Sequence, residues 1–125
     1  MTAVKERARA HVVTDSAGER SAVPVFLSYD PENDPGAVHM SLPASVVGGT
    51  APDDWVFTRD LLERGLTAPV ANGPVSIWPC GRAQAVVELH SATGVSLVQF
   101  DSRALIRFLG LTYAAVATAR VRRLG

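Results

Sequence analysis

Apolar and polar residues alternate along most of the chain with the period of two that is typical of β-strands. The clearest example is residues 23–29, in which one face carries Val23, Val25, Leu27 and Tyr29. Pro24 belongs to the opposite face, and proline has no backbone N–H to donate to a neighbouring strand. We therefore expect this strand to lie at a sheet edge or to carry a bulge at Pro24.

The same alternation predicts about seven strands in total. The remaining strands are expected at residues 5–12, 38–42, 55–57, 75–80, 85–90 and 95–100. Aspartate, proline and glycine crowd residues 29–36, which predicts a turn there, and Thr93-Gly94 predicts a tight hairpin. Residues 43–54 and the segment around Pro69 and Gly73 are expected to be loops.

Two segments have the features of helices instead. Residues 58–65 have Thr58 as a candidate N-cap and Gly65 as a candidate C-terminal stop. The second helix is expected from Ser102 to about residue 120 with Asp101 as its cap. Its apolar face is Leu105, Phe108, Leu109, Tyr113 and Val116. Gly110, in the middle, weakens a helix by about 1 kcal/mol relative to alanine, and it allows a kink or close packing.

A short set of residues recurs at one constant interval along the chain. Phe57, Thr58, Leu62, Arg64 and Leu66 correspond to Phe100, Asp101, Leu105, Arg107 and Leu109. The matches are either coincidental or the trace of two copies of a unit in which strands are followed by a capped helix. In both cases the elements predict one α+β domain over residues 1–125, built from twisted antiparallel β meanders with two helices.

Composition and charge narrow the function classes. The 125 residues are 47% hydrophobic, and 12 basic side chains balance 12 acidic ones. Zero net charge argues against a general nucleic-acid binder. The single cysteine, Cys80, excludes an internal disulfide, and its apolar strand predicts a small buried side chain. Residues 4–9 are too charged for a signal peptide, and we find no run of about 18 apolar residues, so we expect a cytoplasmic protein without a transmembrane segment.

Candidate chemistry is sparse. His11, His39 and His90 lie far apart, and a zinc site needs clustered ligands. The acidic turn that begins at Asp30 resembles a calcium loop, but Ser41 stands where that loop requires a bidentate glutamate. The chain also lacks a nucleophile elbow, a P-loop and a dinucleotide-binding glycine pattern. We therefore expect no metal, no cofactor and no enzymatic activity.

One surface is singled out by charge. Lys5, Arg7, Arg9 and His11 alternate along the first strand, so all four are expected on one face of the sheet. Such a face either is an ordinary solvated strand surface or meets phosphates or an acidic protein. A second basic cluster, Arg120, Arg122 and Arg123, follows near the C-terminus.

Several segments resemble, in order and spacing, the SsgA-like sporulation and cell-division proteins of filamentous actinomycetes. The residues that carry the resemblance are Val23-Pro24-Val25 with Leu27-Ser28-Tyr29-Asp30-Pro31, then residues 34–38, the tryptophan-centred run 55–66, the strand 75–80 and the capped segment 101–108. The sequence departs from the family at Gly36, where the family has an aromatic residue. It departs again in the basic end of the last helix.

The resemblance implies a role in septation and spore maturation, with action at the division septum. It implies a bell-shaped homotrimer of Whirly-like fold that helps position the tubulin-like protein FtsZ, with sister family members as partners. The family offers no catalytic residue to carry over. Exposed members of the Leu61-Leu62 helix or of the loop edge at Trp55 are candidate contacts, and the alternative for each is burial in the core of the monomer. The alternative is a single-stranded nucleic-acid-binding module that uses the basic strand face. Such modules stack bases on exposed aromatic side chains, and we expect every aromatic residue of this chain to lie in the core, which counts against this alternative.

Overall fold

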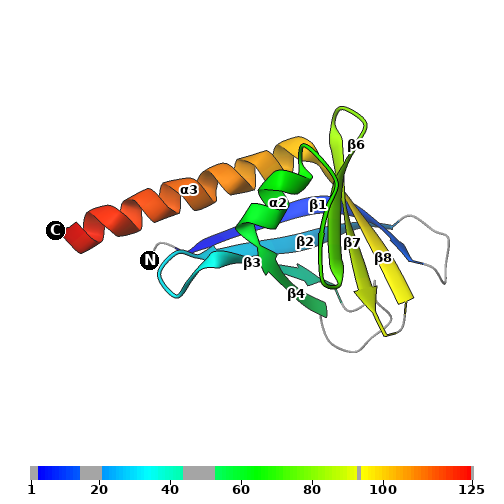
Figure 1. Cartoon of the computed structure of the whole chain (residues 1–125), viewed down its shortest axis with the longest axis horizontal. Helices are drawn as coiled ribbons and strands as arrows, with labels where there is room; N and C mark the ends of the chain where they lie inside the picture. Colours follow the sequence, from blue (N-terminus) through cyan, green and yellow to red (C-terminus); the bar gives the residue numbers. More distant parts are fainter. Residues whose placement is uncertain (1–2, 15–20, 44–52, 93, 125) are drawn as a thin grey trace.

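The computed structural model of the chain describes residues 3–14, 21–43, 53–92 and 94–124 (Figure 1). Within these residues, eight strands form one sheet, and two helices accompany it. The strands are β1 (Val4–Thr14), β2 (Ser21–Asp30), β3 (Asp34–Leu42), β4 (Asp53–Thr58), β5 (Val70–Asn72), β6 (Val75–Cys80), β7 (Gln84–Ser91) and β8 (Gly94–Asp101). The helices are α2 (Arg59–Gly65) and α3 (Ser102–Leu124).

The sheet consists of two four-stranded meanders placed side by side. Its strand order is β4-β3-β2-β1-β8-β7-β6-β5, and every described pairing is antiparallel. β1 and β8 join the two meanders, and each meander is followed directly by a helix. The predicted α+β class and the two pseudo-repeated halves are therefore confirmed.

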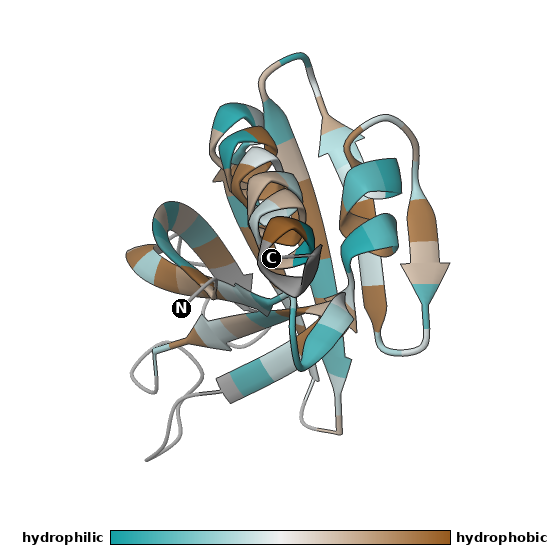
Figure 2. Ribbon diagram, turned by 90° about the vertical axis from the view of Figure 1, so that its left-hand side faces the viewer, coloured by the Kyte–Doolittle hydropathy of each residue, from teal (hydrophilic) through white to brown (hydrophobic). Residues whose placement is uncertain are grey.

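The core lies between the concave face of the curled sheet and α3, which runs across that face (Figure 2). α3 contributes Leu105, Phe108 and Leu109, all at most 5% exposed. Full burial of a side chain of this size stabilises the fold by roughly 1.5–3 kcal/mol. Other large side chains that are fully buried in the fold are Tyr29, Phe100, Leu27, Met40, Leu42, Ile77 and Leu89.

Helix α2 joins the two halves. The hydroxyl oxygen of Thr58 accepts a hydrogen bond from the backbone N–H of Leu61 at 3.0 Å, which confirms the predicted N-cap. α2 contacts β3 and β4 of the first half and β5 and β6 of the second. Gly65 ends the helix, but Leu66 after it keeps right-handed helical backbone angles. The glycine is needed for close packing, because a Cβ there would lie 2.3 Å from Ile77 Cγ2.

Three strand expectations need correction. The expected count of about seven missed β5, which has only 3 residues and lies between Pro69 and Gly73. The turn predicted over residues 29–36 is shorter, because β3 already begins at Asp34. β2 is an interior strand and not an edge, and its irregularity in the pairing with β3 lies between Ser28 and Asp30, not at Pro24. Pro24 lies opposite Arg9 of β1, within a regular antiparallel register. Thr93 of the predicted hairpin lies outside the described residues.

The last helix also differs from expectation. By length and composition alone, its segment Ser102–Val121 could cross a membrane. This segment was not singled out from the sequence, because charged and polar residues interrupt its apolar residues. A third of that segment is buried within the fold, against the sheet. Tyr113 is 44% exposed and so lies off the predicted apolar face. Gly110 is exposed, with no atom within 4 Å of a Cβ built there, so it serves no close packing.

Candidate functional site

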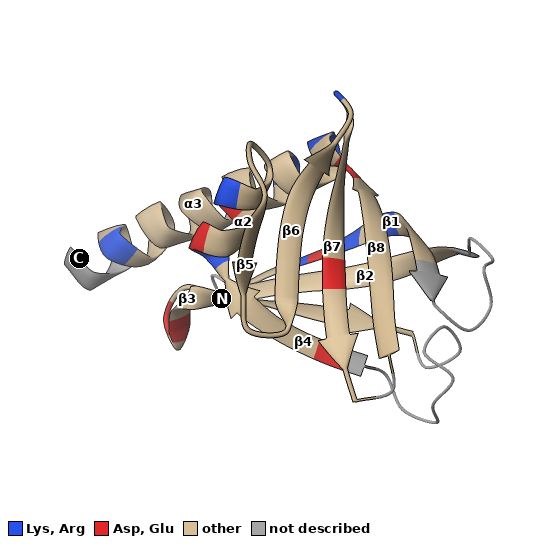
Figure 3. Ribbon diagram, turned by 45° about the vertical axis from the view of Figure 1, so that its right-hand side comes forward, with Lys and Arg blue, Asp and Glu red and all other residues tan. Residues whose placement is uncertain are grey.

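The predicted basic face of β1 is formed. Lys5, Arg7, Arg9 and His11 are all exposed, and the intervening Ala8, Ala10 and Val12 are buried in the core. Figure 3 shows the basic segments of β1 and α3 and the acidic segment of β7. The alternation of the strand therefore presents four basic side chains together on the convex side of the sheet. That they bind a partner stays a prediction.

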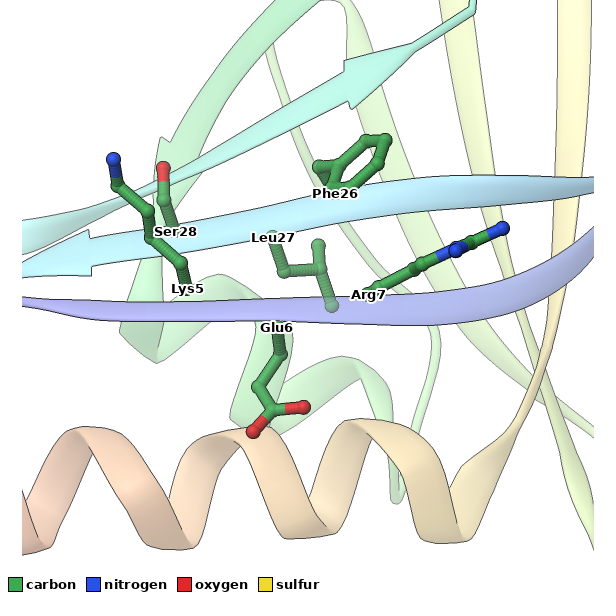
Figure 4. Close-up of a pocket in the computed structure, with 6 residues that line it drawn as sticks. All are labelled: Lys5, Glu6, Arg7, Phe26, Leu27 and Ser28. Atoms are coloured by element: carbon green, nitrogen blue, oxygen red, sulfur yellow. The ribbon is translucent and has the colours of Figure 1, made fainter.

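An exposed aromatic ring lies among these cations. Phe26 on β2 pairs directly with Arg7 on β1 and is 51% exposed. Figure 4 shows Phe26 with Lys5 and Arg7 on the side of the sheet away from α3, and Glu6 on the side toward it. An open depression of about 420 Å³ lies between them. The expectation that all aromatic residues are in the core is wrong here, because position 26 alternates onto the outer face.

The other surface candidates are distributed differently. Leu61 and Leu62 are 5% and 0% exposed and Trp55 is half-buried, so the α2 leucines are core residues and not free contacts. Arg120 is exposed, and the side chains of Arg122 and Arg123 lie outside the described residues. Exposed large apolar residues besides Phe26 are Val56 on β4 and Ile106, Tyr113 and Val121 on α3.

A cluster that sequence reasoning missed joins α2 and α3 to the end of β2 and the start of β3. The guanidinium carbon of Arg59 lies 4.2 Å from the ring centre of Tyr113 and 5.3 Å from that of Tyr29. The buried Tyr29 hydroxyl donates to the backbone oxygen of Pro35 at 2.7 Å and accepts from Arg59 Nη1 at 3.2 Å. Such cation–π stacking is stabilising. No signal in the sequence links residues 29, 59 and 113, which are far apart along the chain.

Tyr113 also donates a hydrogen bond from its hydroxyl to the carboxylate of Glu63. This bond raises the pKa of the Tyr113 phenol above its usual value, because a phenolate could not donate it. The contact ties α3 to α2 on the outside of the molecule. We interpret the whole cluster as a structural clamp.

Several of the histidines and carboxylates that the structure describes contact one another in pairs or close a turn. In the described part of the chain no group of three or more potential ligands comes together. His39 lies 3.5 Å from Asp34, and His90 pairs with Glu88. The Asp30 carboxylate accepts hydrogen bonds from the side-chain amide of Asn33 and from the backbone N–H groups of residues 33 and 32. These bonds favour the ionised carboxylate and so lower the pKa of Asp30. The acidic loop is thus a turn closed by its own aspartate.

Cys80 is exposed at the end of β6, so the prediction of a buried thiol is wrong. Position 80 falls on the outer face of the strand, opposite the buried Val75 and Ile77.

Comparison with known proteins agrees with the resemblance. The family model described as "Streptomyces sporulation and cell division protein, SsgA" matches residues 23–120. A relative from Salinispora tropica, named sporulation-specific cell division protein SsgB, is 38% identical over 83% of this chain and 75% of its own length. The protein of that name from Streptomyces coelicolor is 40% identical over 75% of this chain and 68% of its own length.

Solved structures share the fold. One, from work relating mutations in SsgB to longitudinal cell division during sporulation of Streptomyces coelicolor, has a TM-score of 0.76 at 34% identity, covering 90% of this chain and 86% of that chain. The SsgA-like sporulation-specific cell division protein from Thermobifida fusca gives 0.78 at 25% identity, covering 91% of this chain and 82% of that chain. The chain therefore belongs to the SsgA family of sporulation and cell division proteins.

Proposed function

We propose that this protein controls septation during sporulation through protein contacts, by recruiting or positioning FtsZ or a sister SsgA-like protein at the division septum. The observation that carries the proposal is the family match over residues 23–120, with relatives named sporulation-specific cell division proteins. The site fits it, because the described residues offer exposed apolar and charged side chains on a rigid sheet and no metal cluster.

Self-association as a trimer is part of the proposal. Ile106 is 57% exposed and Val121 is 70% exposed on the outer side of α3, where no described element of the chain covers them. Apolar side chains of this kind are enriched where oligomer subunits meet. The homotrimer and its Whirly-like arrangement stay predictions.

Light scattering tests both parts of this proposal. We expect the purified protein to have the mass of a trimer, and the mass to rise when purified FtsZ is added. Ile106→Ser and Val121→Ser should lower the oligomer mass without unfolding the chain, because both side chains are exposed. A monomer whose mass is unchanged by FtsZ or by a sister family member would contradict the proposal.

The alternative is a single-stranded nucleic-acid-binding module. The specific observation in its favour is the exposed Phe26 beside Arg7, since aromatic rings next to cations stack on unpaired bases. Zero net charge weighs against it. Titration with a labelled oligothymidine, at low and at physiological salt, decides between binding and none.

A further inference from the structure

A row of cations and one aromatic ring share the convex face of β1 and β2. We name this the basic-aromatic patch; it consists of Lys5, Arg7, Arg9 and Phe26. Phe26 is opposite Arg7, and Lys5 and Arg9 are its diagonal neighbours on β1. Diagonal neighbours across antiparallel strands lie about 7–8 Å apart, within reach of long side chains. The three cations therefore line one side of a single ring that is 51% exposed.

The patch lies in an open track that follows the two strands. Depressions of about 300, 420 and 390 Å³ succeed one another along the β1–β2 pair. The first and second share Lys5 and Ser28, and the second and third share Arg7. An extended chain, rather than a compact surface, matches a track of this shape.

One carboxylate residue, Asp30, lines the first depression, and its oxygens accept hydrogen bonds within its own turn. None of the three cations forms an ion pair with a carboxylate in the residues that the structure describes. Glu6, the carboxylate nearest in sequence, points toward α3 on the other side of the sheet (Figure 4). Asp101, at the end of β8, is occupied by the backbone N–H and the guanidinium of Arg103. The surface therefore attracts a negatively charged partner.

We propose that the basic-aromatic patch docks an extended acidic segment of a protein partner. Its carboxylates stand at alternate positions and face Lys5, Arg7 and Arg9, and one apolar side chain covers Phe26. Alternate residues of any extended chain are about 6.6–6.8 Å apart, so the spacing of the two rows matches. Burial of the Phe26 ring supplies the apolar centre, and the cations supply orientation and fast association. The inference rests on the proposed function and names the surface for its contacts.

A protein segment fits the patch better than a nucleic acid. Single-strand binders present several aromatic platforms in succession along a basic groove. Among the described residues, Phe26 is the one aromatic side chain that is more than half exposed. Protein interfaces instead commonly depend on a few central anchors, among which aromatic and arginine side chains are enriched.

The test uses the full chain and a labelled peptide with alternating glutamates and one central leucine. We expect binding that weakens with salt, and amide resonances of Lys5, Arg7 and Phe26 that shift on titration. The double variant Arg7→Glu with Arg9→Glu should weaken binding by about tenfold or more. The matched control, Arg82→Glu with Arg120→Glu, makes the same charge change at exposed positions elsewhere and should bind as the wild type does.

Two further probes identify the role of the ring and the class of partner. Phe26→Ser should weaken binding, whereas Val56→Ser, at a comparably exposed position on β4, should not. A peptide in which glutamine replaces every glutamate should not bind. Failure of the acidic peptide to bind, equal binding by the Arg7→Glu, Arg9→Glu variant, or tighter binding of oligothymidine would each overturn the inference.

The inference and the proposed function fail in different ways. If FtsZ or a sister protein binds the wild type and the charge-reversed variant equally, the proposed function stands and the patch assignment is wrong. If the acidic peptide binds at the patch but neither protein binds, the patch assignment stands and the proposed partners are wrong.

Discussion

Two glycines in helices should respond in opposite directions to the same substitution. A Cβ at Gly65 would lie 2.3 Å from Ile77 Cγ2, 2.5 Å from its Cβ and 3.3 Å from its backbone carbonyl carbon. Carbon atoms pack at about 3.5–4.0 Å. Ile77 is fully buried and β-branched, so its side chain has no free rotamer to adopt. Gly65→Ala must therefore displace α2 from β6.

The magnitude follows from two opposed effects. Overpacking a core costs about 1–3 kcal/mol. Alanine returns up to about 1 kcal/mol of helix propensity. Because the overlap is deep and involves Ile77 close to its backbone, we expect a net loss of about 2 kcal/mol for Gly65→Ala. Gly110→Ala meets open space in an exposed helix and should gain about 0.5–1 kcal/mol.

Thermal unfolding followed by circular dichroism measures both variants at one protein concentration. We expect the Tm to fall by about 8 °C for Gly65→Ala and to rise by about 3–5 °C for Gly110→Ala. Larger residues at position 65 should destabilise further. A Gly65→Ala variant with a Tm at or above that of the wild type would refute the packing of α2 on β6 described above.

Other contacts give predictions of known sign. Thr58→Ala removes the cap that accepts the N–H of Leu61 and should destabilise the fold by about 1 kcal/mol in urea unfolding. The hydrogen bond that raises the pKa of Tyr113 stabilises the fold fully at pH values below the ordinary phenol pKa of 10.0, and this stability is lost as the pH rises through the folded-state pKa. Ultraviolet titration should show one tyrosine that ionises at higher pH than an ordinary phenol, and Tyr113→Phe should remove that step. Because its pKa is lowered, the Asp30 carboxylate stabilises the fold at pH values above the ordinary pKa of 3.8, and this stability is lost as the pH falls through the folded-state pKa. Asp30→Asn should therefore make the unfolding free energy less dependent on pH in the acidic range. A carboxyl titration by NMR with an ordinary Asp30 midpoint would contradict the closed turn.

Periodicity was sufficient for the elements that have clear alternation or caps. Thr58 and Asp101 were identified as caps because a hydroxyl or carboxylate before an apolar helical pattern is a local signal. Their constant interval also pointed to two halves, which the sheet order confirms. Three-residue β5 carries too few positions to show alternation, and its edge place depends on pairing with β6.

The surface was only partly predictable. The basic face of β1 follows from alternation alone. That Phe26 shares this face and pairs with Arg7 depends on the register between β1 and β2, which the sequence does not specify. The clamp of Tyr29, Arg59 and Tyr113 likewise requires the tertiary approach of α2 to α3. Cys80 was misplaced because an apolar neighbourhood in sequence does not reveal which face a strand end turns outward.

The most direct test of the proposed function is localisation in sporulating cells. A fluorescent fusion of the full chain, expressed in sporulating Streptomyces hyphae together with labelled FtsZ, reports both position and timing. We expect the fusion to form regularly spaced foci at the future septa and to coincide with FtsZ as septa form. A fusion that is stably expressed but spread evenly through the hyphae, while FtsZ forms its usual ladders, would contradict a role in septation through contact with the division apparatus.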